Sequence, residues 1–187
     1  MSNTDQQTEK SAELAESAMR VSDRVEIRGV VLVSAKLARG DVREGTNFDV
    51  KIRRSARAKM DASRKLLIVQ VEIGFTARAD SELEKPPSVE AWATYELTYS
   101  VPDQTGLTQE HFDAFAEMNG VFNAWPYFRE FLHSSLSRMG LPPFTLPVLR
   151  IGAAVRSRSP ESAKSMDQLA GETDGSVGKH EPPELSK

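Results

Sequence analysis

Residues 119–150, NGVFNAWPYFREFLHSSLSRMGLPPFTLPVLR, decide the fold class of this chain. Apolar side chains recur there at helical spacing as far as Gly140, a residue type that often ends helices. They are Phe128, Phe131, Leu132, Leu136 and Met139. The Pro-rich residues 141–148 predict an extended segment, because proline and the residue before it avoid helical backbone angles. The stretch therefore predicts an amphipathic helix followed by an extended chain.

The beginning of this helix has two interpretations. Thr108 can cap a first helical segment, and Glu110 in its first turn suits the positive end of the helix dipole. Residues 119–120, Asn-Gly, can interrupt it. If Asn123 then caps a second helix, Pro126 lies in the first turn, where its missing N–H is harmless. Otherwise one long helix is kinked at Pro126.

Upstream of the helix, apolar residues alternate with period two in four stretches, near residues 25–37, 48–59, 67–75 and 89–99. In the first stretch Val25, Ile27, Val31 and Val33 share one parity, broken only at Gly29. The turn-rich connections are too short for parallel crossovers and favour antiparallel pairing. We therefore expect an α+β fold with a four-stranded antiparallel sheet followed by a long Pro-kinked helix.

The aromatic residues mark the limits of the folded part. All thirteen lie between Phe48 and Phe144. Residues 1–20 are polar and predict a disordered lead-in with a short Ala/Glu stretch, and residues 152–187 contain nine hydrophobic residues and predict a disordered tail. The folded domain is expected over residues 21–151.

Composition excludes several classes of site. The chain has no cysteine, which excludes disulfides, thiolate zinc sites, iron–sulfur ligation and a cysteine nucleophile. No metal-binding spacing relates His111, His133 and His180, and we find no phosphate-binding loop, nucleophile elbow or catalytic carboxylate pair. The sequence predicts a protein that is not an enzyme and binds no metal or cofactor. It shows no secretory signal and no apolar run of bilayer length, so we expect it in the cytoplasm.

Both parities of the predicted strands contain apolar residues, which is unusual for a sheet with one solvated face. Val30 and Leu32 alternate with Val31 and Val33, and Trp92 lies between two alanines. Leu66 and Ile68 show the same pattern. We expect the second face to be covered by another subunit, a partner or a client, since the tail has no aromatic residue with which to cover it.

Ten basic residues and four acidic residues lie between Lys36 and Lys65. One interpretation is a nucleic-acid-binding module that uses the strand between Lys51 and Lys65 to grip phosphates. The other is an edge strand that charge protects against pairing with another sheet. The second is favoured, because the aromatic residues mostly share the core parity and not the basic one.

The helical stretch resembles the SecB family of export chaperones. Trp125-Pro126-Tyr127 with Arg129-Glu130 matches that family's aromatic-Pro-Tyr-x-Arg-Glu pattern, and Leu141-Pro142-Pro143-Phe144 matches its Pro-rich segment. The resemblance covers residues 24–150. It implies an ATP-independent holdase that binds unfolded or precursor polypeptides in extended form and assembles as a homotetramer, a dimer of dimers.

By this resemblance we expect five residues to contact clients: Phe48, Val50, Ile52, Trp92 and Phe144. Pro126, Tyr127, Arg129 and Glu130 match the helix motif and are assigned to architecture and subunit contact. Family members serve protein export through the SecA motor or protect the antitoxin of a toxin–antitoxin pair. Docking to the motor uses an acidic sheet surface, whereas the second strand here is basic, which puts motor docking in doubt. The sequence leaves export and antitoxin protection open.

Overall fold

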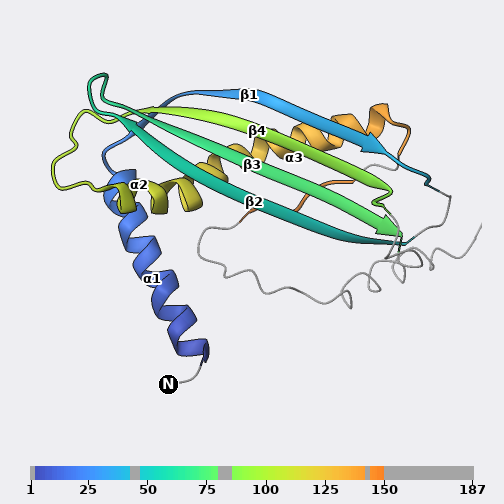
Figure 1. Ribbon diagram of the computed structural model, residues 1–187, viewed down its shortest axis with the longest axis horizontal. Coiled ribbons are helices and arrows are strands. Elements are labelled where there is room, and N and C mark those ends of the chain that lie inside the picture. Colours follow the sequence, from blue (N-terminus) through green and yellow to red (C-terminus); the bar gives the residue numbers. More distant parts are fainter. Residues whose placement is uncertain (1–2, 43–46, 80–85, 142–143, 150–187) are drawn as a thin grey trace, which may run out of the picture. The chain divides into compact units, whose positions relative to one another are not determined.

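Four long strands form one antiparallel sheet: β1 (Glu26–Arg39), β2 (Phe48–Asp61), β3 (Leu66–Ala79) and β4 (Val89–Ser100) (Figure 1). The computed structural model describes residues 3–42, 47–79, 86–141 and 144–149. The order across the sheet is β1-β4-β3-β2, so β1 and β2 are its edges. The antiparallel sheet predicted from the short connections is confirmed.

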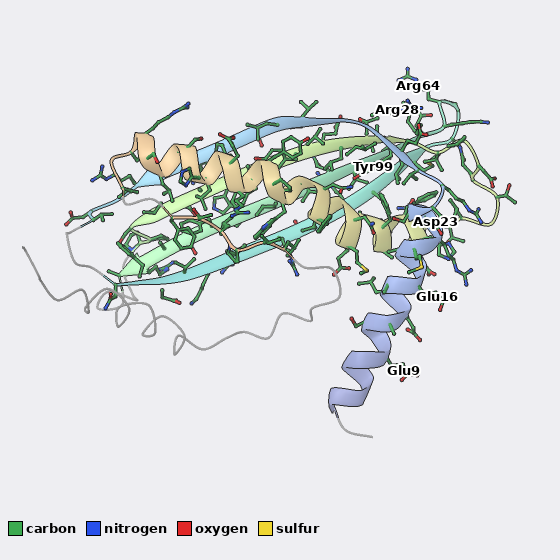
Figure 2. The ribbon with its side chains drawn as sticks, turned by 180° about the vertical axis from the view of Figure 1, so that it is seen from behind. Glu9, Glu16, Asp23, Arg28, Arg64 and Tyr99 are labelled. Atoms are coloured by element: carbon green, nitrogen blue, oxygen red, sulfur yellow. The ribbon has the colours of Figure 1, made fainter. Side chains whose placement is uncertain are left out.

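The two faces of the sheet differ in what covers them. Alternate residues of β3 and β4 are buried, among them Val71 and Ile73 on β3 and Tyr95 and Leu97 on β4. They face the helix that lies across the sheet in Figure 2. We call this side the helix face and the other side the open face. Because residues paired across strands point to the same side, the even-numbered residues of β2 lie on the helix face and its odd-numbered residues on the open face.

The helix face is covered by α2 (Gln109–Phe115), the π-helical turn η2 (Ala116–Gly120) and α3 (Val121–Arg138), which follow one another without a break. Thr108 is the N-cap of α2, as expected. Of the two interpretations of Pro126, the single long helix is correct, since Pro126 lies inside α3. Asn123 is not a cap: its side-chain amide donates a hydrogen bond of 3.0 Å to the Tyr99 hydroxyl.

Two glycines explain the course of this helix. A Cβ atom on Gly120 would lie 2.7 Å from Cγ1 of Val69, so the missing side chain allows η2 to approach β3 closely. Gly140 has a φ of +67°, and the Leu141 N–H donates to the Leu136 carbonyl at 3.0 Å just beyond α3. This left-handed glycine ends the helix where the sequence predicts.

Strand β1 departs from its predicted parity. Its pairing with β4 shifts between Ile27 and Gly29 and again between Leu32 and Ser34. Leu32 therefore pairs with buried Tyr95 and lies on the helix face, whereas Val31 pairs with Glu96 and lies on the open face. The expectation that Val31 and Ile27 share one face is wrong, because a bulge adds a residue between them and reverses the alternation.

The N-terminal segment is a helix and not the disordered lead-in predicted for residues 1–20. Helix α1 spans Asn3–Ser22 and extends away from the sheet (Figure 1). Its last turns pack against α2 and bury Ala18 and Val21, and the Asn119 amide donates to the Ser22 hydroxyl at 3.0 Å. Packing against α2 supplies the stability that the polar segment lacks on its own. The disordered tail predicted for residues 152–187 lies outside the described residues.

Candidate polypeptide-binding surface

Edge strand β1 carries apolar side chains on the helix face that α3 leaves uncovered. Ile27, Leu32 and Leu37 are 49%, 47% and 40% exposed. Their cross-strand partners on β4 are buried. The main contacts of α3 with the sheet are with β2, β3 and β4, and these three side chains of β1 stay exposed. Exposed aliphatic side chains along the margin of a sheet can bind an extended polypeptide through apolar contacts.

Tyr127 of α3 borders the same margin. Its side chain is 50% exposed, and its ring centroid lies 6.3 Å from that of Tyr95, the cross-strand partner of Leu32. Burial raises the pKa of Tyr95 to about 12, and the negative charge of Glu130 adds to the effect. Tyr95 is thus a neutral part of the core at ordinary pH, and Tyr127 presents the aromatic surface to solvent.

A second candidate surface is a hollow of about 470 Å³ between α3 and residues 145–149. The Trp125 indole N–H donates to the Pro147 carbonyl at 2.9 Å and fixes the two sides of the hollow. Its most exposed apolar walls are Phe122, 38% exposed, and Val148, 68% exposed. The hollow can accept an apolar side chain from a bound polypeptide or from another subunit.

The structure brings together four of the five residues predicted to contact clients. Phe48, Val50 and Ile52 lie on the helix face of β2. The ring of Phe144 packs 5.4 Å from that of Phe75, which is the cross-strand partner of Ile52. Except for Ile52, which is 38% exposed, they are half-buried against the core. They form the opposite edge of the helix face from the β1 margin.

Trp92 is separated from these four residues, because it lies on the open face. Its indole covers Gly74 of β3, and its Nε1–H donates to Oε1 of Glu90 at 3.0 Å. This hydrogen bond lowers the pKa of the Glu90 carboxyl, and the Lys36 ammonium, 3.4 Å away, lowers it further. The indole is half-buried on a polar face and does not join the surface on the helix face.

The helix-motif residues divide between the two sides of α3. Pro126, Arg129 and Glu130 line the hollow, and Tyr127 adjoins Tyr95 beside the β1 margin. Their assignment to subunit contact stays a prediction.

Sequence reasoning missed the residues of the β1 margin as a site. The mixed apolar run from Val30 to Val33 signalled something unusual, but the bulges decide which of its side chains face the helix. Among the residues that the structure describes, no cluster of three or more metal-binding side chains occurs. In the same part of the chain, no helix has the length and hydrophobicity to cross a membrane.

Comparison with solved structures shows that the fold is similar to that of a SecB-like chaperone. The SecB-like chaperone Rv1957 of Mycobacterium tuberculosis, solved in complex with a ChAD peptide from the HigA1 antitoxin, superposes with a TM-score of 0.64. The match covers 73% of this chain and 99% of that one, at 20% sequence identity. It confirms at the level of the fold the resemblance that the helix motif suggested.

Other comparisons add little. A protein of unknown function from Streptococcus agalactiae matches over 66% of this chain and 96% of its own, with 8% identity and a TM-score of 0.36, too low to carry an argument. No family model matches the sequence. No curated protein matches it with significance either.

Proposed function

We propose that this chain is an ATP-independent SecB-like holdase that binds extended, unfolded polypeptide segments and protects them. The observation that carries the proposal is the apolar margin of β1 on a SecB-like fold, where three aliphatic side chains stay at least 40% exposed. A monomeric sheet gains nothing from leaving such residues in water, and their burial against a client is favourable.

The client that we propose is an antitoxin or a protein of similar use, in preference to a general export precursor. Support comes from the structural neighbour, which binds an antitoxin peptide. The charge of the β2 edge agrees, since this edge is basic, whereas motor docking in the family uses an acidic sheet surface. Docking to the SecA motor is therefore not part of the proposal.

We propose a cytoplasmic homotetramer as the working form. Both faces of β1 are exposed along residues 31–39, and the outer edge of β1 pairs with no other strand among the described residues. An edge strand with free backbone groups is suited to pairing with a second chain, while its side chains on the helix face stay available to a client.

The first test measures native mass with and without a denatured, slowly folding polypeptide. A species of about four times the 20.7 kDa chain that gains the mass of one client supports the proposal. If the native mass does not change when the denatured polypeptide is added, the holdase proposal is refuted. A tetramer that fails to bind the polypeptide would be a scaffold without a client.

Two neighbouring variants locate the surface. Leu32→Thr removes an apolar side chain from the helix face, and Val31→Thr removes one from the open face of the same strand. Because about half of Leu32 is already covered, we expect Leu32→Thr to weaken client binding about fivefold. Val31→Thr is the matched control and should bind as the parent does. Equal losses in both variants would show that the helix face is not the client surface.

A further inference from the structure

The open face of edge strand β2 carries a row of cations. Its odd-numbered residues point to this face, and four of them are Lys51, Arg53, Arg57 and Lys59, which we call the basic strip. Ser55 lies at the middle of the strip, so the charges form a symmetrical pattern along the strand. All four basic side chains are exposed.

Most of this charge has no counterion nearby. Among the described residues, only Lys51 of the strip contacts a carboxylate, with its Nζ 3.3 Å from Oδ2 of Asp49. The Arg57 Nε–H donates at 2.8 Å to Oε1 of Gln70, a neutral amide. In the part of the chain that the structure describes, Arg53 and Lys59 form no ion pair. Three of the four cations of the strip thus have no contacting carboxylate among the described residues.

The rest of the open face restricts what this line can bind. Next to β2, the open face of β3 and β4 presents Glu72, Glu90 and Glu96, and Arg78 lies on the same face opposite Asp49, so acids border the middle of the basic strip. A wide polyanion lying across the sheet meets these acids, whereas a single extended strand along β2 avoids them. The Trp92 ring packs on Gly74 and its Nε1–H donates a hydrogen bond to Glu90, so the ring is held in place against the sheet.

The edge of β2 favours polypeptide over a single nucleic-acid strand. Since β2 pairs only with β3 in the described chain, its outer backbone groups can pair with an added β-strand. Alternate residues of such a strand lie about 6.6 Å apart, the same repeat as the basic strip, and face its side chains directly. A nucleic acid has no backbone groups that continue this ladder.

We propose that the open face of β2 docks an acidic, extended polypeptide segment of a partner protein, at a site separate from the apolar margin of β1. The pattern of the strip defines the ligand: acids at positions 1, 3, 7 and 9 of a nine-residue strand meet Lys51, Arg53, Arg57 and Lys59 in either strand direction. Binding is electrostatic and weakens as salt rises.

The test uses the full-length protein and a labelled nine-residue peptide with Glu at positions 1, 3, 7 and 9 and Thr elsewhere. Fluorescence anisotropy measures its affinity at about 50 and 300 mM salt, beside the same peptide with Gln for Glu and a nine-nucleotide thymidine strand. We expect only the Glu peptide to bind, with an affinity that falls at the higher salt concentration.

The double variant Arg53→Ser/Lys59→Ser removes the two unpaired cations. It should weaken binding of the Glu peptide about five- to tenfold, as expected for two exposed ion pairs. Arg54→Ser is the matched control, because Arg54 is exposed on the same strand but points to the helix face, and it should leave the affinity unchanged. Circular dichroism verifies that each variant is folded.

Several results overturn the proposal. Equal binding by the double variant and the parent, or by the Gln and Glu peptides, eliminates the strip as the docking site. Tighter binding of the oligonucleotide than of the peptide replaces it with the nucleic-acid module considered from sequence. If Leu32→Thr, a substitution on the helix face, abolishes binding of the Glu peptide, the peptide binds as a client and not at β2.

Discussion

The contact between Gly74 and Trp92 makes Gly74→Ala a stringent test of the open face. A Cβ atom on Gly74 would lie 2.4 Å from Cζ3, 2.5 Å from Cε3 and 2.6 Å from Cη2 of the Trp92 indole. These distances are far below van der Waals contact, so the ring must leave its place on β3. The movement also breaks the hydrogen bond from Nε1 to Glu90.

The expected loss of stability follows from three contributions. Overpacking costs about 1–3 kcal/mol, and the lost, partly exposed hydrogen bond costs about 0.5–1 kcal/mol. Alanine gains about 0.5–1 kcal/mol over glycine in a strand, because Gly74 has no positive φ and its backbone suits any residue. The free energy of unfolding should therefore fall by about 1–3 kcal/mol.

Urea unfolding followed by far-ultraviolet circular dichroism measures this loss at one fixed protein concentration. Repeating Gly74→Ala in a Trp92→Ala background removes the obstacle, so the substitution should there be neutral or slightly stabilising. Gly29→Ala is the matched control, since no atom lies within 4 Å of its Cβ position. If Gly74→Ala costs the same with and without the indole, the described contact is not the cause.

Three further predictions concern the core, its ionisation and α1. Phe128 has no solvent exposure, so Phe128→Ala should lower the free energy of unfolding by about 3–5 kcal/mol in urea titrations. A loss below about 1 kcal/mol would contradict the burial of Phe128 in the core. Because the pKa of Tyr95 is raised from 10.0 to about 12, its contribution to stability is complete below pH 10 and is lost as pH rises toward 12. Tyr95→Phe should reduce this alkaline loss in unfolding curves between pH 9 and about 12, and an unchanged pH profile counts against the burial of the phenol. Ala18→Asp should detach α1 and abolish its amide protection in hydrogen exchange, because the buried alanine is replaced by a charged side chain. Met19→Asp is the control, since Met19 is 63% exposed, and should leave the protection of α1 unchanged. Equal protection of α1 in both variants would show that Ala18 is not in a packed contact.

The helix and its end could be read from local patterns. Leu132 and Leu136 repeat at helical spacing, and Gly140 ends the pattern with the backbone angle that glycine alone adopts easily. The continuity of the helical run through Gly120 could not be read from the sequence, because it depends on the close fit of this glycine against Val69 of β3.

The candidate polypeptide-binding surface could be placed from the sequence only in part. The helix-face placement of Phe48, Val50 and Ile52 follows from strict alternation along β2, which has no register shift. Trp92 lies on the open face, apart from the other four residues predicted to contact clients, and only the pairing of β4 with Gly74 shows what its ring covers. The order of strands, which makes β1 and β2 the edges, has no local signal at all.

The sequence by itself determined the four alternating strands, the long helix and the basic character of β2, because each depends on the spacing of residues along the chain. Tertiary structure alone decided the rest. The bulges in β1 determine which of its aliphatic side chains lie on the helix face. Packing against α2 stabilises the polar N-terminal segment as a helix. Both outcomes depend on partners distant in sequence, whose contacts outweigh local preference once the sheet has formed.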